Sequence, residues 1–403
     1  MRDMLAGIRV IEVAAWTFVP SSGAVLAEWG ADVIKVEDPE RGDPQRGLVN
    51  SGLIPKGGVN FMVELPNRGK RSVGLDVSTL VGRELLYRLV ETADVFVTSF
   101  LPDVRNRLGI DVAHIRARNP RIIYVRGSAL GPRGDEAGLG GFDSATYWSR
   151  AGLAAAFTEK GSEYPVSIRP AFGDIMGGLA LAGGVAAALL RRERSGTPSV
   201  VDVSLLGLGL WNLSADVTAA KLFEGIPKNS YDRHSAPNPL TGTYRTKDDR
   251  FISFMVLQID RYWSSFCEHI DRPDLVDEPR FKDNAARFEH RRECILLLRD
   301  IFRTRTFKEW CDRLQTFEGV WEPVNTPREV HDDPQVIANG YLETVTTASG
   351  VTFDMPTNPV QFDLTPPSVR GAPDHGEHTE EVLLELGLTY EEIIKHKTSG
   401  AVL

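Results

Sequence analysis

The sequence of 403 residues is poor in cysteine, and it contains no long apolar run. Its three cysteines, Cys267, Cys294 and Cys311, form no CxxC pair. They are predicted to be reduced thiols in a cytoplasmic protein rather than a disulfide framework. The longest uncharged stretch in the middle of the chain, residues 175–190, has 16 residues. A membrane span needs about 20 apolar residues, so no membrane partner is predicted.

Motifs for common cofactor and hydrolase chemistries are also missing. No GxGxxG follows the first predicted strand, which argues against NAD or FAD binding. Neither a GxSxG elbow nor an HExxH pair is present. The sequence DHGEH at residues 374–378 has the ligand types of a metal site. Polar residues before a helix usually cap it, however, and no metal site is predicted.

The charge balance excludes one large class of partner. With 46 Lys+Arg against 55 Asp+Glu, the net charge of -9 opposes nucleic-acid binding, which needs a basic face. Positive charge is nevertheless concentrated between residues 66 and 133, which hold 12 Lys+Arg and 6 acidic residues. A compact polyanion could therefore still bind to this segment.

Short β-branched runs alternate with helical patterns through the first half of the chain, which is typical of a mainly parallel sheet with helices on its faces. Strands are predicted at residues 8–13, 33–36, 71–75, 95–98, 122–125 and 200–203, and helices at 21–29, 81–92 and 174–194. A Pro- and Asn-rich break at 235–243 precedes an antiparallel-looking pair and charged helices. We predict an α/β, Rossmann-like core and a second, smaller α+β domain.

One carboxylate stands out from the pattern. In RPAFGDIMGG, residues 169–178, Asp174 lies where a loop becomes a helix. An aspartate there is most often only a helix cap. However, the helix is apolar on nearly every face, and Gly173 leaves one side of the carboxylate uncovered. A poorly solvated carboxylate at a helix N-terminus is a competent nucleophile toward an activated acyl group.

Several segments occur in an order that points to one protein family. They are GADVIKVE at 30–37, NRGKRSVGLD at 67–76, SFLP at 99–102, NPRIIY at 119–124, GFD at 141–143, the Asp174 helix and GEHT at 376–379. In these segments the chain resembles the class III CoA-transferases (CaiB/BaiF type), which include formyl-CoA and carnitine CoA-transferases. The resemblance implies a large Rossmann-like domain built from residues 1–220 and 336–403, a small domain at 221–335, and an interlocked homodimer, or a heteromer with a homologous chain.

The same resemblance implies a mechanism. The aspartate matching Asp174 attacks the thioester of an acyl-CoA donor, which gives a mixed anhydride and then an aspartyl-CoA thioester. A carboxylic acid acceptor takes over the CoA through a second anhydride. Coenzyme A is a substrate here, and neither a metal nor a permanently bound cofactor is expected.

The resemblance also places the coenzyme site. The matching CoA contacts are Thr17, Phe18, Leu75, Asp76, Ser99, Phe100 and Arg107, and the loop beside the thioester is Gly140, Gly141, Phe142 and Asp143. We add Lys70 and Arg71 from the residues themselves, because a cationic pair entering a strand near this site suits phosphate.

Departures from the family leave two alternatives open. Asp38 stands where members often have an arginine, which puts one adenine-side contact in doubt. The glycine-rich loop that formyl-CoA transferase closes over its intermediate has no counterpart near residues 238–242, so formyl or oxalyl specificity is not supported. A related 2-methylacyl-CoA racemase would have its histidine where this chain has Phe142, which cannot accept a proton. A CoA-binding subunit without activity would be expected to lack Asp174.

The substrate stays open at this point. Trp16, Tyr147, Trp148 and Phe157 lie near segments expected to face the acyl group, which suggests a bulky or aromatic acid. They could equally be core or interface residues.

Overall fold

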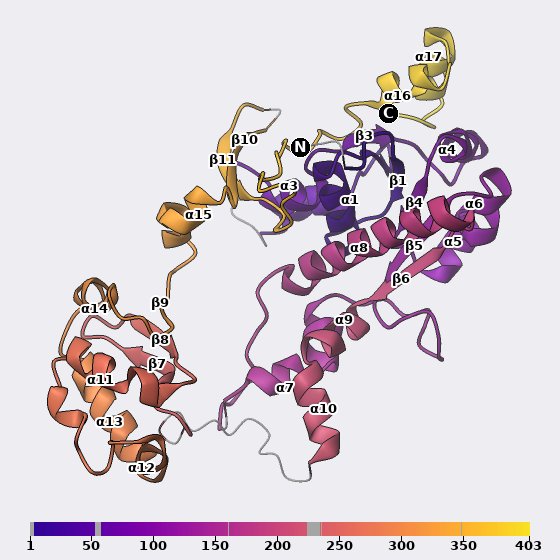
Figure 1. Ribbon diagram of the computed structural model, residues 1–403. Helices are drawn as coiled ribbons and strands as arrows, with labels where there is room; N and C mark the ends of the chain where they lie inside the picture. The colour runs from indigo at the N-terminus through magenta and orange to yellow at the C-terminus, as the bar shows by residue number, and fades with distance from the viewer. Residues whose placement is uncertain (1–3, 53–57, 160, 224–233, 235, 348) are drawn as a thin grey trace. The chain divides into compact units, whose positions relative to one another are not determined.

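The computed structural model describes residues 4–52, 58–159, 161–223, 234, 236–347 and 349–403. Within these residues the chain divides into two compact units (Figure 1). The larger unit comprises residues 1–158, 164–226 and 334–403, and the smaller unit comprises 159–163 and 227–333. The domain limits expected from the sequence, after residues 220 and 335, lie close to these positions.

The larger unit is built on one parallel sheet. Its strands are β1 (Arg9–Val13), β2 (Asp32–Glu37), β3 (Arg71–Gly74), β4 (Val95–Thr98), β5 (Ile123–Ser128) and β6 (Val200–Ser204). They lie in the order β3-β2-β1-β4-β5-β6, and every neighbouring pair is parallel. Val and Ile dominate these strands because helices bury both faces of the sheet. The predicted α/β fold with a parallel sheet is confirmed.

Two sets of helices cover the two faces (Figure 1). On one face, α1 (Phe18–Glu28) and α8 (Phe172–Ser195) pack over Val10, Val95 and Ile123. On the other face lie α4 (Leu80–Glu91), α6 (Val112–Arg118), α16 (Thr379–Glu385) and α17 (Tyr390–Thr398). The C-terminal segment thus completes a core that begins near the N-terminus, and Val402 forms a β-bridge with Leu75.

The remaining elements of the larger unit surround this core. They are α2 (Leu48–Ser51), α3 (Phe61–Asn67), α5 (Pro102–Leu108), a π-helical turn (Ser144–Arg150), α7 (Leu153–Phe157), α9 (Leu205–Asn212), α10 (Ser214–Leu222), α15 (Pro334–Ala338) and the hairpin of β10 (Leu342–Thr346) and β11 (Thr352–Pro356).

The smaller unit has an antiparallel sheet and its own aromatic core. The sheet contains β7 (Thr241–Arg245), β8 (Phe251–Met255) and β9 (Trp321–Pro323), and the helices are α11 (Ile259–His269), α12 (Asn284–Glu289), α13 (Arg291–Phe302) and α14 (Phe307–Leu314). Cys267 and Cys294 are buried in this core, and burial raises the pKa of each thiol to about 12. Both are therefore protonated and unreactive.

Helix α8 is the longest element, and glycine ends it. The chain leaves the helix at Gly196 with φ +69°, the left-handed conformation that glycine adopts without strain. By length and composition alone α8 could cross a membrane. In this unit it packs instead along α1 and the sheet, as the core helix of an α/β fold does.

Glycines allow α8 to approach α1 closely. A Cβ on Gly177 would lie 2.3 Å from the ring of Phe18. A Cβ on Gly178 would lie 2.3 Å from the Ser21 Cβ and 2.9 Å from the Ser21 carbonyl carbon. Real Cβ atoms do not come so near to other atoms, so any side chain at these positions would force the helices apart.

We therefore expect Gly178→Ala to lower the free energy of unfolding by about 2 kcal/mol, because the added methyl group meets backbone atoms that cannot turn away. Gly183→Ala in the same helix is the matched control, since nothing lies within 4 Å of its Cβ position. That variant should gain about 0.5 to 1 kcal/mol from better helix propensity. Urea unfolding of both variants measures the difference, and equal stabilities would contradict the packing argument.

Candidate active site

A cavity opens at the edge of the sheet where the parallel strands end. Between β1 and β4 the strand order changes direction, and in open α/β sheets ligands bind at such a switch point. Ala15 and Trp16 follow β1, while Ser99 and Leu101 follow β4, and all four line the cavity. A hydrogen bond of 3.1 Å from the Ala15 N–H to the Ser99 hydroxyl joins the two strand ends.

The cavity measures about 110 Å³, and its walls are mostly apolar. The residues that line it are Ala15, Trp16, Phe18, Ser99, Leu101, Gly127, Ser128, Ala129, Gly140, Gly141, Phe142, Asp174 and Leu205. Asp174 is the one ionisable side chain among them. Among the residues that line the cavity, it is the side chain best suited to act as an acid, a base or a nucleophile.

Asp174 occupies the first turn of α8, where the helix dipole favours a negative charge. Gly173 before it lets Tyr147 come close, since a Cβ on Gly173 would lie 2.6 Å from the tyrosine ring. Burial, and to a smaller extent the nearby charge of Asp143, together raise the pKa of the Asp174 carboxyl to about 7. Near neutral pH the group is therefore divided between a protonated form and a strongly nucleophilic carboxylate.

Asp143 is a second buried carboxyl beside the first. Its exposed fraction is 8%. Burial raises its pKa, while the backbone amides of Ser144 and Gly173 act in the opposite direction. Its Oδ2 has no hydrogen-bond partner in the part of the chain that the structure describes. A poorly solvated carboxyl group whose pKa is raised by a neighbouring carboxyl group is typical of catalytic sites.

The structure brings several of the predicted CoA contacts together around Asp174. Phe18, Ser99, Gly140, Gly141 and Phe142 line the cavity with Asp174. Thr17 and Phe100 are their sequence neighbours. Their contacts with CoA remain predictions.

Three further predicted CoA contacts, Leu75, Asp76 and Arg107, lie around the same end of the sheet. Leu75 and Asp76 follow β3, so they lie at its carboxyl end, two strands away from β1. Leu75 is buried in the core, and only its backbone can face a ligand. Arg107 in α5 is exposed, and it makes no ion pair with any residue that the structure describes. These roles also remain predictions.

Lys70 was assigned wrongly. Its side chain is fully buried, and Nζ donates to both carboxylate oxygens of Glu12 at 2.8 Å and to the Pro20 carbonyl at 2.9 Å. An ammonium group that is enclosed and paired in this way cannot reach a phosphate in solution. Lys70 instead neutralises a carboxylate within the core.

Arg71 was also assigned wrongly, because it lies where the strands begin, whereas the cavity lies where they end. It is the first residue of β3. Its guanidinium is bound to Asp32 at 2.7 Å, to Glu381 at 2.9 Å and to Glu385 at 2.6 Å. These carboxylates leave little of its charge for a ligand.

Other cations of the basic segment are paired within the fold too. Arg105 binds Asp111, and Arg118 binds Glu84. Arg126 binds Asp202 on the neighbouring strand β6. Asp111 and Glu84 belong to the segment themselves, but Lys70, Arg71 and Arg126 are paired with acids outside residues 66–133. The positive surplus of the segment is therefore partly neutralised, and it is weaker support for a polyanion site than the sequence indicated.

Several cavity residues were missed from the sequence. Ser128 is the last residue of β5, Ala129 follows that strand, and Leu205 follows β6. Because the carboxyl ends of parallel strands meet at one edge, these positions could have been found by listing the residues after each predicted strand. No motif marks them individually.

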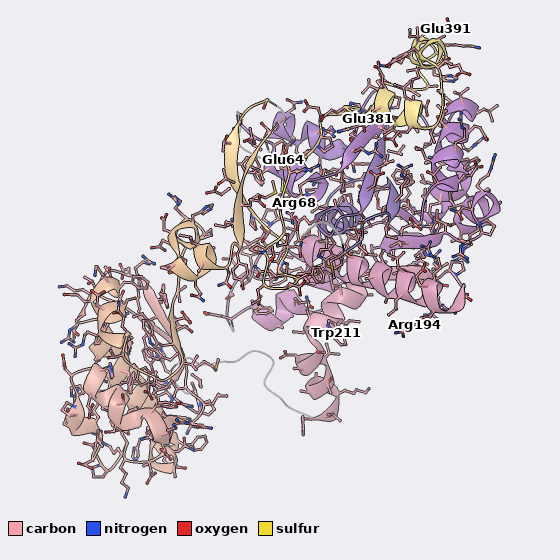
Figure 2. The ribbon with its side chains drawn as sticks, turned by 45° about the horizontal axis from the view of Figure 1, so that its top comes forward. Glu64, Arg68, Arg194, Trp211, Glu381 and Glu391 are labelled. Atoms are coloured by element: carbon pink, nitrogen blue, oxygen red, sulfur yellow. The ribbon has the colours of Figure 1, made fainter. Side chains whose placement is uncertain are left out.

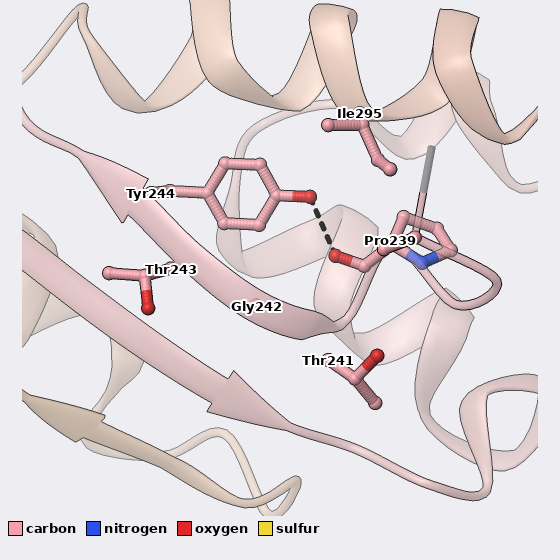
Figure 3. Close-up of a pocket in the computed structure, with 7 residues that line it drawn as sticks. Pro239, Thr241, Gly242, Thr243, Tyr244 and Ile295 are labelled. Carbon is pink, nitrogen blue, oxygen red and sulfur yellow. Dashed lines mark hydrogen bonds between the residues drawn. The ribbon is translucent and has the colours of Figure 1, made fainter. Parts of the chain in front are cut away.

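The smaller unit contains a cavity of about 210 Å³, lined by Ala236, Pro239, Thr241, Gly242, Thr243, Tyr244 and Ile295 (Figure 3). The Tyr244 hydroxyl donates a hydrogen bond of 2.6 Å to the Pro239 carbonyl. None of these seven side chains is a carboxylate, amine, imidazole or thiol. This cavity therefore offers no chemistry comparable to that of Asp174.

Comparison with known proteins shows the family to which the chain belongs. The family model described as CoA-transferase family III matches residues 5–379. The (R)-2-hydroxy-4-methylpentanoate CoA-transferase of Clostridioides difficile is 30% identical over 99% of both chains. The cinnamoyl-CoA:phenyllactate CoA-transferase of Clostridium sporogenes is 28% identical over 97% of this chain and 95% of its own.

A solved structure has the same fold. The crystal structure of a CaiB/BaiF family protein from Brucella suis superposes with a TM-score of 0.81 at 27% identity, covering 96% of this chain and 100% of that one. By sequence and by fold, the chain is an enzyme that belongs to CoA-transferase family III.

Proposed function

We propose that this enzyme moves CoA from an acyl-CoA thioester to a free carboxylic acid through covalent intermediates on Asp174. The observation that carries the proposal is the position of this carboxylate. It lies in an apolar cavity at the switch point of the sheet and at the start of a helix. Partial desolvation makes it a better nucleophile, and the helix N-terminus provides amides for the developing oxyanion.

The proposed first half-reaction needs no added proton. A carboxylate oxygen of Asp174 attacks the thioester carbonyl carbon, the carbon–sulfur bond breaks, and the CoA thiolate leaves a mixed anhydride behind. The thiolate then attacks the Asp174 carbonyl carbon of the anhydride. This step releases the donor acid as its carboxylate and forms the aspartyl-CoA thioester.

The second half-reaction repeats these steps in the opposite order. The acceptor carboxylate attacks the aspartyl thioester, which forms a second anhydride and frees the thiolate. The thiolate attacks the acyl carbon of the acceptor, so that a new acyl-CoA forms and the Asp174 carboxylate is restored. The walls around Asp174 would keep water from hydrolysing either anhydride.

The relatives named above act on branched and aromatic acids, and we propose a carboxylic acid acceptor for this chain as well. We further propose a cytoplasmic location, in which the three cysteines stay reduced. We also propose a homodimer with the interlocked arrangement that the family resemblance implies.

An exposed apolar surface supports the dimer. Trp211 on α9 has an exposed fraction of 77%, and Leu222 at the end of α10 and Phe223 after it are exposed as well. Figure 2 shows the Trp211 side chain projecting from α9. A second copy of the chain would cover such a surface.

We expect the purified enzyme, incubated with an acyl-CoA, to gain the mass of CoA on Asp174. Adding a free acid should discharge the adduct and yield a new acyl-CoA. Asp174→Ala should abolish the adduct and lower exchange by at least about 10³-fold, because the nucleophile is lost. Intact-mass and peptide mass spectrometry locate the adduct. The control is Glu391→Ala, an exposed carboxylate on α17 (Figure 2).

Two other results would contradict this mechanism. Exchange that persists in Asp174→Ala would exclude the covalent route. Deuterium uptake at the α-carbon of a 2-methylacyl-CoA without any CoA exchange would indicate a racemase instead, although Phe142 lines the cavity where that activity would need a base.

We expect adduct formation to rise about tenfold per pH unit below pH 7 and to level off above it, because only the ionised carboxylate attacks and its pKa is about 7. Asp143→Asn removes a negative charge that raises this pKa. The rising part of the pH–rate profile, its acid limb, should therefore move to lower pH. Single-turnover rates between pH 5 and about 9 measure the shift. Glu391→Gln should leave the limb in place, and a limb that moves upward in Asp143→Asn would refute the assignment.

We expect sedimentation to give a dimer of about 89 kDa, twice the chain mass of 44.5 kDa. Trp211→Glu should shift the population toward monomer, because it places a charge in the proposed interface. Tyr390→Glu, at another exposed aromatic position on α17, is the matched control. A wild-type monomer would argue against the homodimer and favour a heteromer with a homologous chain.

A further inference from the structure

Trp16 has a backbone conformation that a large side chain rarely adopts. Its φ is +68°, in the left-handed region, where a Cβ atom is disfavoured and glycine is the usual residue. Strain of this kind persists only where the surroundings hold it in place, and it occurs preferentially at functional sites. The question is what holds Trp16 in this turn and what its side chain does there.

Buried charged groups hold the turn on one side. Lys35, fully buried on β2, donates to the Ala14 carbonyl at 2.9 Å and to Asp43 Oδ2 at 2.9 Å. The other oxygen of Asp43 accepts a hydrogen bond of 3.3 Å from the Trp16 N–H. The Lys35–Asp43 ion pair therefore binds the backbone both before and at Trp16.

A buried amide holds the turn on the other side. In the orientation that satisfies both ends of the Gln45 amide, its nitrogen donates to the Trp16 carbonyl at 3.1 Å, and its oxygen accepts from the Thr17 hydroxyl at 2.6 Å. Lys35, Asp43 and Gln45 thus engage the polar groups of residues 14–17 from within the core. We name these three side chains the turn clamp, and they act as positioning residues for Trp16.

The side chain of Trp16 is not buried in the core. Its exposed fraction is 38%, and it lines the same cavity as Asp174. There it meets Phe142, whose exposed fraction is 57%, edge to face, with ring centroids 5.5 Å apart. Two partly exposed aromatic rings therefore form one wall beside the nucleophile, and the turn clamp fixes one of them.

The mostly apolar walls of the cavity suit an apolar acyl chain. Its volume of about 110 Å³ is smaller than the roughly 150 Å³ of an enclosed apolar cavity that holds one benzene molecule, but this cavity is open to solvent, so a ring or branched chain need not fit inside it completely. An aromatic ring or a branched chain could lie against the faces and edges of Trp16 and Phe142. A short acyl group such as acetyl would leave most of this wall uncovered.

We propose that Trp16 is a specificity-determining residue, which selects acyl groups with an aromatic or branched apolar chain over short linear ones. The inference rests on the proposed function, because it needs the acyl group to be attached at Asp174. It goes beyond that function by naming the acyl class and the residue that discriminates. The left-handed turn places this side chain in the site at the expense of backbone strain.

The test compares two donors, 3-phenylpropionyl-CoA and acetyl-CoA, by the rate at which each forms the covalent CoA adduct on Asp174. Wild type should react faster with the aromatic donor. Trp16→Gly should lower this preference about tenfold, mainly through the aromatic donor, because it removes the wall. Its midpoint of thermal unfolding should not fall below that of wild type, because glycine suits the φ of this position.

Further variants distinguish the loss of the aromatic wall from a loss of folding. Trp16→Phe should keep most of the preference. Phe142→Ala, at an exposed position where folding is not at risk, should lose preference in the same direction as Trp16→Gly. Tyr390→Ala on α17 should change neither rate.

The outcomes distinguish a failure of the proposed transferase activity from a failure of the proposed role of Trp16. If neither donor forms an adduct, the proposed function fails, and this inference fails with it. If adducts form but wild type shows no preference, or if Trp16→Gly slows both donors equally, the transferase stands and the role of Trp16 is refuted.

Discussion

The close approach of α1 and α8 is the constraint on which the rest of the larger unit depends. Gly177 and Gly178 leave room for Phe18 and Ser21 where any side chain would collide. This contact fixes α8 along the sheet, and it therefore fixes the first turn of α8 at the ends of β1 and β4. Asp174 reaches the cavity because that turn does. The glycine-rich character of the helix is thus a requirement of the site as well as of the core.

A network of buried charged side chains contacts the turn at residues 14–17, which lies beside the cavity. Glu12 lies between Lys35 and Lys70, and all three side chains are fully buried. Burial outweighs the attraction of Glu12 and lowers the pKa of Lys70 to about 8. Such networks add little stability over apolar packing, but losing one member leaves an unpaired charge. Here their benefit is geometric, because Lys35 and Asp43 fix the turn that carries Trp16.

Much of this architecture follows from the sequence, for identifiable reasons. Runs such as those at β1, β2 and β5 are rich in Val and Ile because both faces of a parallel sheet are buried, and so the strands could be predicted from composition. Asp174 could be found because a carboxylate before an apolar helix is unusual. Family resemblance added the fold of the two chain ends, which periodicity alone did not provide.

The errors have an equally physical origin. Lys70 and Arg71 looked like phosphate ligands because the sequence does not show that Glu12 and Asp32, on other strands, are in reach of them. Asp43 and Gln45 lie in a segment that reads as a polar loop, and nothing local marks them as buried. The left-handed turn at Trp16 was equally invisible, since no sequence pattern specifies a positive φ for tryptophan.

The return of the C-terminal segment to the sheet also sets the timing of folding. The Gly74 N–H donates to the Thr379 hydroxyl across 305 residues of sequence. At about 5 to 20 residues per second of synthesis, β3 is made about 15 to 60 s before α16, the helix that covers it. During this interval the apolar face later covered by α16 and α17 is open to other nascent chains. Chaperone demand in the cell should therefore depend on how quickly the last part of the chain is made.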